Sequence, residues 1–548
     1  MQLPASALRY FPYLFCLVGA VVTLGLTWFS LLWLLAAVPL TALAALGTWD
    51  VVQTRRTISR NYPVLAHFRY LLESIGPELR QYFIQSDTDE LPFSREQRNI
   101  VYQRAKDILD KKPFGSLIPM NAEGYEWMNH SLAPVEIVDK NFRVKVGSHA
   151  KTLKPYDVSV FNISAMSFGS LSANAILALN AGAKKGGFYH DTGEGSISRY
   201  HREPGGDLVW EIGSGYFGCR KPDGSFDPEL FAKNAQLDQV KMIEIKLSQG
   251  AKPGHGGILP AAKVTEEIAA ARGVTVGEDV VSPAAHSAFH TPLELMAFIA
   301  QLRELSGGKP VGFKLAIGHP WEWFGIAKAM LETGEHPDFI VVDGGEGGTG
   351  AAPLEFINRL GMPMTDALLL VHNTLVGANL REKIALGAAG KVTSAFNIAR
   401  TLALGADWCN GARGFMFSLG CIQSLSCHND KCPSGVATQD QGRGSKLDVA
   451  DKSERVYHFQ HNTVLALANL LEAAGLSHPR ELGPEHIMRR VTKYEVQPYS
   501  ELFQFLEPGV LLDGRAELHV FKKYWAQAKA DSFGAPDFMI RLRETKLR

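Results

Sequence analysis

Charge is missing from one long stretch of this chain. Between Tyr10 and Trp49 there is no aspartate, glutamate, lysine, arginine or histidine. Roughly 20 apolar residues cross a bilayer as one helix, so this stretch can hold two. We therefore expect a transmembrane helical hairpin, at about Pro12–Phe29 and Leu31–Leu46. A cleaved signal peptide is the alternative, although the apolar run is longer than a signal peptide needs.

Arginines flank the apolar stretch on both sides. Arg9 precedes it, and Arg55, Arg56 and Arg60 follow. Because basic residues next to a membrane span stay on the cytoplasmic side, both ends of the hairpin are expected in the cytoplasm. The rest of the chain would then be attached to the inner face of the cell membrane.

Cysteine and net charge are also scarce. The 548 residues hold only six cysteines, too few for a disulfide scaffold, which favours a reducing compartment. Acidic and basic residues balance at 56 each, so no bulk field attracts nucleic acid. We expect no nucleic-acid partner and a chain of one large domain with appendages.

Four regions are expected after this survey: an anchor at 1–50, a helical connecting region at 51–150, a catalytic domain at 151–440 and a helical extension at 441–548. In the connecting region, Tyr62–Phe83 has helical apolar spacing, and Ser94 with Gln97 is a typical helix start. In the extension, Val456–Ala474 and Glu485–Val496 are predicted helices. The extension would cover the catalytic domain or contact a second subunit in a homo-oligomer.

Short β-branched runs alternate with helical stretches from about Val158. Eight runs are counted: SVFNISAMSF, FYHDTGEG, MIEIKLSQGAKPG, DVVSP, PVGFKLAIG, FIVVDGGEGG, ALGAAGKV and WCNGARG. Eight strand–helix units predict an α/β fold, a (β/α)₈ TIM barrel. An open doubly wound sheet is the alternative, but no dominant glycine fingerprint follows the first run. Ile197–Lys233, with WEIGSGYFGCR, is expected as an insertion at the barrel mouth.

Polar residues gather where the predicted strands end, which is where barrel enzymes place their functional groups. They are Ser164, Ser167, Glu194, Lys246, Gln249, Lys252, Lys314, Asp343, Glu346 and Arg413. A core strand has no use for three lysines, so they indicate an anionic ligand, most simply a phosphate and a carboxylate. Segments rich in small residues follow the seventh and eighth runs and suit the phosphate. They are Gly390 with Lys391, and Gly411, Ala412, Arg413 and Gly414.

Two groups of these residues have more specific interpretations. Lys314 points into the barrel mouth, where it can stabilise negative charge on a reduced flavin, or it pairs with Asp343 or Glu346. Lys246, Gln249 and Lys252 can together hold the two carboxylates of a dicarboxylate. Arg272 adds a bidentate contact or caps its helix, and His286 and His290 are interpreted as structural.

Three cysteines occupy one short segment, CIQSLSCHNDKCPSGVATQ. Cys421, Cys427 and Cys432 suit an iron–sulfur cluster with three ligated corners. Zinc, with His428 as a fourth ligand, and three inert thiols are the alternatives.

These phrases, in order, resemble the FMN-binding synthase domain of glutamate synthases. NISAMSFGSLS, DTGEGS, EIKLSQGAKPGHGG, FKLAIG and DGGEGGTGAAP match, together with the cysteine segment, over Asn162–Gln439. The resemblance implies FMN, a 3Fe-4S cluster on the three cysteines, and 2-oxoglutarate on the Lys246–Lys252 loop and Arg272. It places FMN along Ser164, Ala165, Met166 and Ser167, then Lys314, Gly344, Gly345 and the glycines after the seventh and eighth runs.

The chain also departs from the full glutamate synthases. No glutaminase with a cysteine nucleophile fits ahead of the barrel, since Cys16 lies in the apolar stretch. The resemblance is therefore to stand-alone, membrane-tethered glutamate synthase-like FMN proteins. The source of nitrogen, whether ammonia or glutamine, stays open.

The expected reaction is the reductive amination of 2-oxoglutarate with ammonia to give L-glutamate. Lys314 and Glu194 are the candidate catalytic residues, and electrons would arrive through the cluster from a ferredoxin, a reductase subunit or a membrane quinol. Formation of N-methylglutamate, or oxidation of a hydroxy or amino acid, are alternatives on the same scaffold. A non-catalytic membrane electron-transfer subunit and a binding protein without cofactor are alternatives of another class.

Overall fold

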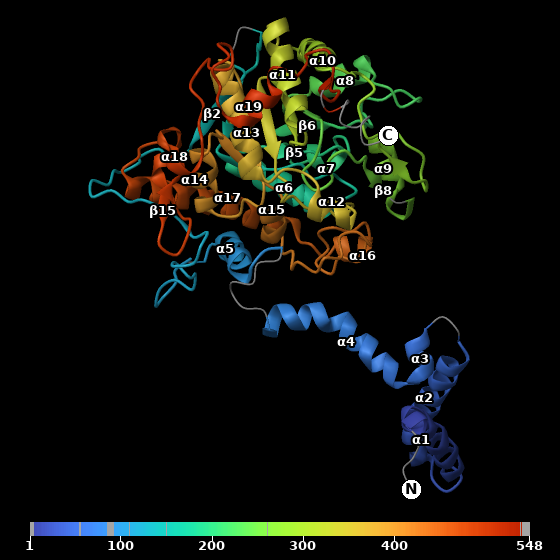
Figure 1. The fold of residues 1–548 in the computed structure, drawn as a ribbon. Helices are drawn as coiled ribbons and strands as arrows, with labels where there is room; N and C mark the ends of the chain where they lie inside the picture. The colour runs from blue at the N-terminus through green and yellow to red at the C-terminus, as the bar shows by residue number, and fades with distance from the viewer. Residues whose placement is uncertain are drawn as a thin grey trace. The chain divides into compact units, whose positions relative to one another are not determined.

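The computed structural model describes residues 5–53, 56–84, 92–108, 110–148, 151–259, 261–537 and 539 (Figure 1). Two compact units make up the chain, Met1–Ser86 and Asp87–Arg548. Arg55, one of the arginines predicted to flank a membrane hairpin, lies outside the described residues, as do residues 540–548 of the predicted extension.

Two long apolar helices form most of the first unit. Helix α1 spans Ala5–Leu26, and α2 spans Leu34–Val52 after a single 3₁₀ turn at Leu31–Trp33. Small residues lie where α1 meets α2, with Cys16, Ala20 and Ala44 buried between the helices. Most of the large apolar side chains face outward and are exposed. The segments 9–26 and 31–52 are long and apolar enough to cross a membrane, by length and composition.

Residues 56–84 of the first unit are largely helical, as predicted. Helix α3 (Thr57–Asn61) leads into α4 (Leu65–Leu79), which continues as a π-helical turn at Arg80–Ile84. The buried Asp50 carboxylate, near the end of α2, accepts hydrogen bonds from Val64 N at 3.0 Å and His67 Nε2 at 2.9 Å. This contact fixes the start of α4 on the end of α2.

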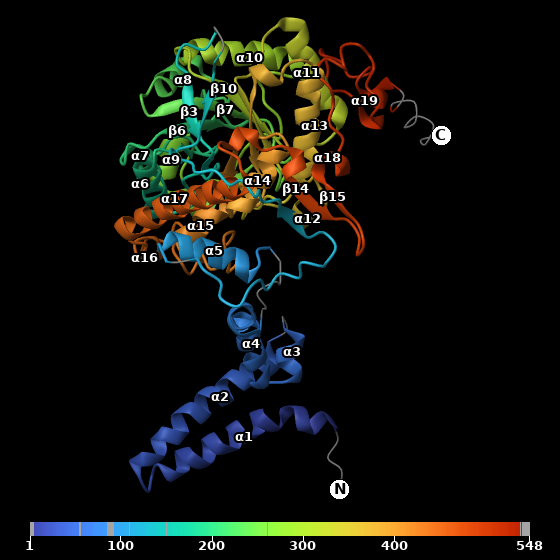
Figure 2. The same cartoon turned by 90° about the vertical axis from the view of Figure 1, so that its left-hand side faces the viewer.

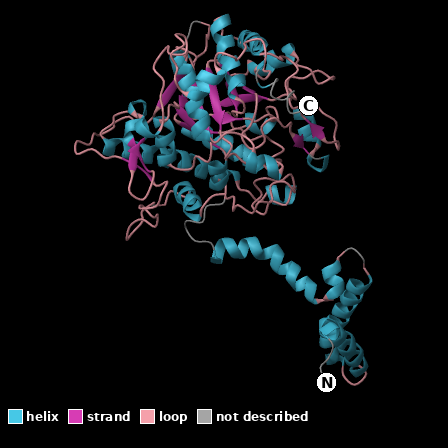
Figure 3. Ribbon diagram, in the orientation of Figure 1, coloured by secondary structure: helices cyan, strands magenta, loops and turns pink. Residues whose placement is uncertain are grey.

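Eight parallel strands close into a barrel in the second unit, which confirms the predicted fold class (Figure 3). In barrel order they are β4 (Phe161–Ile163), β5 (His190–Asp191), β6 (Leu208–Ile212), β7 (Val240–Lys246), β10 (Val311–Leu315), β11 (Phe339–Asp343), β12 (Ala385–Ala389) and β13 (Trp408–Gly411). Their side chains are buried almost throughout, because helices cover the outside and packed side chains fill the inside.

One predicted strand is wrong, and a missed one takes its place. The run DVVSP forms only β9 (Val280–Val281), which pairs antiparallel with β8 (Ile258–Leu259) outside the barrel. The third barrel strand is instead β6, within the segment predicted as an insertion. Glu211 makes β6 hard to recognise from the sequence, because a charged residue in the middle of a run is not typical of a buried strand.

Helices follow the strands around the barrel. They are α6 (Ala173–Gly186), α7 (Arg199–Arg202), α8 (Pro228–Ala235), α9 (Glu266–Arg272), α10 (Pro292–Leu305), α11 (Pro320–Thr333), α12 (Leu354–Arg359), α13 (Met364–Gly377), α14 (Ala395–Ala403) and α15 (Arg413–Ser418), with 3₁₀ turns at Ala261–Lys263 and Arg381–Lys383. Side-chain caps at Ser172, Thr291 and Ser394 explain why three of them begin where they do.

Segments before and after the barrel pack on it together. Helix α5 (Arg95–Ala105) begins with the predicted Ser94–Gln97 capping box. Helix α17 (Val449–Ala474) ends at Gly475, as predicted, and lies against α5 and α6 (Figure 2). The other elements of these segments are β2 (Arg143–Val146), β3 (Tyr156–Ser159), α16 (Gln441–Gly444), α18 (Tyr499–Leu502), α19 (His519–Tyr524) and two 3₁₀ turns, Pro479–Glu481 and Pro484–His486.

The predicted helix at 485–496 is wrong. Residues Ile487–Arg490 form β14, which pairs antiparallel with β1 (Glu126–Met128) and with β15 (Val496–Pro498). The hairpin between β14 and β15 contains Val491, Thr492 and Tyr494, residue types that favour extended backbone over helix.

Candidate functional site

A narrow cavity of about 30 Å³ lies at the carboxyl end of β7. Lys246 is the last residue of that strand, and the loop that follows brings Gln249 and Lys252 to the same cavity. Glu194, from the loop after β5, closes another side. The structure therefore brings together four of the residues that the sequence predicted, at the end of the barrel where function is expected.

Opposite charges meet inside this cavity. Lys246 Nζ lies 2.9 Å from Glu194 Oε1. Burial alone would raise the pKa of Glu194, but Lys246, Lys252 and Arg272 lower it to about 2. Glu194 is therefore ionised at neutral pH. Burial lowers the pKa of Lys252, which shows how costly a second cation is here unless an anion binds beside it.

Arg272 lies deeper than a helix cap would. It is the last residue of α9, its guanidinium stacks over the Phe217 ring at 5.2 Å, and Nη2 donates to Phe168 O at 3.2 Å. Its Nε is buried with no hydrogen-bond partner among the described residues. Arg272 contributes to the field on Glu194 but does not line the cavity itself.

His286, interpreted as structural from the sequence, lines the same cavity. Its Nε2 lies 2.9 Å from Lys246 O, and its Nδ1 lies 3.1 Å from the Tyr216 hydroxyl. Burial lowers the pKa of His286 to about 4, so the ring is neutral at pH 7. Since a carbonyl only accepts, Nε2 carries the proton and holds the end of β7 in place. No sequence signal connects this histidine to Lys246, 40 residues away.

Lys314 on β10 is buried in a layer of acidic side chains. Its ammonium contacts the Glu211 carboxylate and lies 3.7 Å from Glu244 Oε1. The partners suggested by the sequence are engaged elsewhere: Asp343 accepts from Gly250 N at 2.9 Å, and Glu346 accepts from Met364 N at 2.9 Å. Burial alone would lower the pKa of Lys314, but Glu211, Glu244 and Asp191 raise it well above its usual value.

The residues predicted to hold FMN lie at the ends of neighbouring strands. Ser164, Ala165, Met166 and Ser167 follow β4, Gly344 and Gly345 follow β11, Gly390 and Lys391 follow β12, and Gly411, Ala412 and Arg413 end or follow β13. Backbone hydrogen bonds join them, from Ser164 N to Gly411 O at 3.0 Å and from Gly344 N to Ala389 O at 2.8 Å.

Two cations among these residues share one aromatic ring. Arg413 lies over the Phe93 ring at 4.6 Å and Lys391 at 5.9 Å. Burial lowers the pKa of Arg413 to about 10. Phe93 precedes α5, more than 300 residues before Arg413 in the chain, so the sequence alone did not reveal it. The two cations and their glycine neighbours form a positive corner of the barrel mouth.

The three cysteines lie on one loop, and side chains from other segments donate hydrogen bonds to its backbone. Tyr102 donates its hydroxyl to Cys421 O at 2.6 Å, and Lys263 Nζ lies 3.2 Å from Cys427 O. Burial raises the pKa of Cys421 to about 12. Hydrogen bonds from Ser434 and from the backbone N–H groups of Ala437 and Val436 overcome burial and lower the pKa of Cys432. A sulfur surrounded by N–H donors is suited to carry negative charge.

Fold and site together define a (β/α)₈ barrel protein with a cationic mouth. The chain belongs to the glutamate synthase family: the family model described as "Conserved region in glutamate synthase" matches residues 129–477. This confirms the family that the sequence motifs indicated.

Relatives of known name agree. The chain is 39% identical over 493 residues to the glutamate synthase large subunit-like protein YerD of Bacillus subtilis (strain 168), covering 83% of this chain and 94% of YerD. It is 32% identical over 361 residues to the archaeal-type glutamate synthase [NADPH] of Thermotoga sp. (strain RQ2), covering 66% and 68%. It is 31% identical over 354 residues to the archaeal glutamate synthase [NADPH] of Methanocaldococcus jannaschii, covering 64% and 65%.

Proposed function

We propose that this protein is an FMN-dependent oxidoreductase that converts 2-oxoglutarate and ammonia to L-glutamate. The observation that carries the proposal is the cavity at the end of β7, where Lys246, Gln249 and Lys252 converge in a glutamate synthase barrel. Lys314 is the register partner of Lys246 on the neighbouring strand. Two lysines on one loop suit a ligand with two carboxylates, such as 2-oxoglutarate.

FMN fits the residues at the barrel mouth. Gly344, Gly345, Gly390 and Gly411 lie at or just after the ends of neighbouring strands, and Lys391 and Arg413 supply positive charge for the phosphate. Lys314 would lie near the ring, where negative charge grows on reduction. When bound, FMN supplies the hydride that reduces the carbon–nitrogen double bond.

The chain's own residues position the reactants. Lys246 and Lys252 hold the carboxylates of the keto-acid, so that its carbonyl carbon has one fixed orientation. Glu194 is ionised, so it cannot act as a proton donor at neutral pH. It can accept a hydrogen bond from ammonia beside that carbon.

An iron–sulfur cluster fits the cysteine loop. Cys432 has N–H donors around its sulfur, and a Cβ placed on Gly350 would lie 3.1 Å from the Cys427 carbonyl. Gly350 belongs to the glycine-rich loop that begins with Gly344 and Gly345. The loop proposed for FMN therefore touches the loop proposed for the cluster, which supports electron delivery from a 3Fe-4S cluster to FMN.

We also propose a membrane anchor for the first unit. Helices α1 and α2 are long, apolar and largely exposed on their outer faces, and arginines flank them. This supports attachment to the cell inner membrane with the barrel in the cytoplasm. A ferredoxin, a reductase subunit or a membrane quinol would then supply the electrons.

The decisive experiment is an anaerobic assay of purified protein with a chemical reductant, 2-oxoglutarate and ammonium. We expect glutamate, and we expect 2-oxoglutarate to perturb the visible spectrum of the bound flavin. Methylamine in place of ammonium tests the alternative of N-methylglutamate formation. Protein with a full complement of FMN that forms neither product would rule out the proposed reaction.

Lys252→Met is expected to weaken 2-oxoglutarate binding by roughly 10- to 100-fold, because one charge-assisted hydrogen bond to a carboxylate is lost. Spectral titration measures the dissociation constant. Lys241→Met is the matched control, since Lys241 lies at the opposite end of β7 and pairs with Asp207 at 3.6 Å. Equal weakening by both variants would show that Lys252 does not bind the ligand.

Cys432→Ser is expected to lower the bound iron by at least roughly tenfold, because one ligand of the cluster is lost. Iron analysis and the electron paramagnetic resonance of the oxidised protein measure the effect. Cys219→Ala is the control, since Cys219 is a buried free thiol in the turn segment between β6 and α8, outside the 421–432 segment. Full iron content in the Cys432 variant would contradict a cluster at this position.

A further inference from the structure

A layer of charged side chains crosses the interior of the barrel beneath the cavity. Asp191, Glu211, Glu244 and Lys314 come from four consecutive barrel strands, β5, β6, β7 and β10. Glu244 precedes Lys246 by two residues, so both side chains point to the same side of β7. Glu211 and Glu244 are register partners on adjacent strands. Bulky apolar side chains fill this position in most barrels, so this layer needs an explanation.

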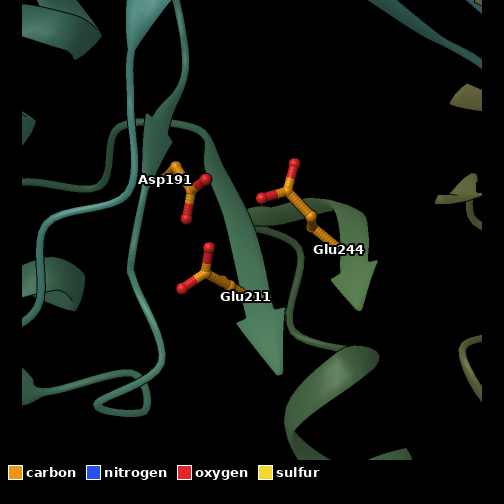
Figure 4. A group of neighbouring side chains, drawn as sticks. All are labelled: Asp191, Glu211 and Glu244. Carbon is orange, nitrogen blue, oxygen red and sulfur yellow. The ribbon is translucent and has the colours of Figure 1, made fainter. Parts of the chain in front are cut away.

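The three carboxylates converge on one another (Figure 4). One oxygen of each lies within 4.8 Å of the others, and all three side chains are at most 2% exposed. Three buried carboxylates alone would suit a divalent cation. Here the ammonium of Lys314 takes the cation's place, in contact with Glu211 and 3.7 Å from Glu244. We therefore do not assign a metal to this layer.

Charge does not balance if every acid is ionised. Three carboxylates and one ammonium leave two uncompensated negative charges in a space without solvent, and like charges this close cannot all persist. The three acids differ in their partners. Glu211 holds the lysine, and Asp191 Oδ1 accepts from Gly193 N at 3.0 Å. Glu244 Oε1 is buried and has no hydrogen-bond partner among the described residues.

We propose that Asp191 and Glu244 share one proton at neutral pH, carried mainly by Glu244, and that this pair positions Lys314. The shared proton leaves Glu211 as the principal counterion of the lysine. It also reduces the uncompensated charge of the layer from two negative charges to one, while the ammonium stays charged. Glu211 and Glu244 thus hold different charges although they are direct neighbours.

The surrounding groups support this distribution. Burial and Asp191 raise the pKa of Glu244 well above its usual value, and burial and Glu211 raise the pKa of Asp191 to about 7. Other ionisable groups act on the layer: Asp343 on Lys314, Lys252 on Glu211, and Tyr189 on Glu244 and Asp191, while Lys246 acts on Asp343. Tyr189 donates its hydroxyl to Asn410 Oδ1 at 2.6 Å, and burial raises its pKa, so it stays neutral.

One consequence rests on the proposed function. The layer lies below the ring that Lys314 would face, so its net charge acts on the reduction potential of bound FMN. If the pair loses its proton at high pH, added negative charge disfavours the reduced flavin. The potential of the wild-type protein should therefore fall more steeply with pH than that of a variant in which Glu244 cannot ionise.

The proton itself is tested by infrared spectroscopy at about pH 7.5, where ordinary carboxyls are ionised. We expect the wild-type protein to show the carbonyl stretch of a protonated carboxylic acid, and Glu244→Gln to lose it. Glutamine has the same shape and no charge, so the fold should persist. Glu335→Gln is the control: Glu335 is also poorly exposed, but Arg303 and Lys151 pair with it, and its pKa is lowered. A band that keeps both its frequency and its intensity in Glu244→Gln overturns the proposal.

Thermal unfolding gives a second readout. A carboxyl whose pKa is raised in the folded state stabilises the fold at low pH, and that contribution is lost as the pH rises towards the folded pKa. The Glu244→Gln variant lacks this loss. Its melting temperature, relative to wild type, should therefore increase between about pH 5 and pH 9, and a flat or falling difference contradicts the proposal. Both readouts work on protein without FMN, so failure of the proposed reaction does not affect them.

Discussion

Replacing Lys314 with methionine is expected to lower the rate of glutamate formation by about 10²- to 10³-fold, the usual effect of removing one charged group that stabilises a transition state. Lys314 is the cation in the acidic layer, and it contacts Glu211. Without it, negative charge beneath the flavin is no longer compensated, so the flavin should also become harder to reduce. Single-turnover kinetics and the midpoint potential of bound FMN measure the two effects.

Lys309→Met is the matched control for this variant. Lys309 is another buried lysine, two residues before β10, but its ammonium donates to the backbone oxygens of Ala235 at 2.6 Å and Leu237 at 2.7 Å. Its loss leaves two carbonyls without a donor and should lower the free energy of unfolding by about 1–3 kcal/mol. The flavin potential should not change. If both variants lower the rate equally, the effect of Lys314 is structural only.

The sequence was sufficient to predict the part of the candidate site that lies at the ends of strands. Lys246, Gln249 and Lys252 follow a recognisable β-branched run, and parallel strands bring their carboxyl ends together, so order along the chain was enough to group them. The glycines at 390 and 411 were found in the same way. The structure confirms that these segments are neighbours.

Groups in the middle of strands were missed for a physical reason. Glu211 and Glu244 lie inside runs of buried apolar residues, where a charged residue argues against a core strand. β6 was predicted as part of an insertion, and Glu244 was predicted only as part of a strand, with no role. Only closure of the barrel shows that the two acids meet Lys314. Phe93 was missed, and the partners of His286 were not predicted, because these contacts join segments that are far apart in the chain.

Gly250→Ala is expected to disrupt the binding of both ligands at once. A Cβ on Gly250 would lie 1.8 Å from Gly344 O, a backbone atom that no side-chain rotation can move. The loop that carries Gln249 and Lys252 would have to separate from the loop proposed for FMN. We expect bound FMN to fall by about tenfold or more, and the free energy of unfolding to fall by about 1–3 kcal/mol, as overpacking usually costs.

Gly318→Ala is the control for Gly250→Ala. It tests whether any glycine-to-alanine substitution at the barrel mouth disrupts ligand binding. Gly318 follows β10 at the same end of the barrel, and a Cβ there would meet no atom within 4 Å. That variant should keep its FMN content, its response to 2-oxoglutarate and its melting temperature. In the wild-type protein, Gly250 N also donates a hydrogen bond to Asp343. An alanine at position 250 keeps this N–H donor. A Gly250 variant with full FMN would mean that the loops can separate without opening the site, and the close approach would then have no functional role.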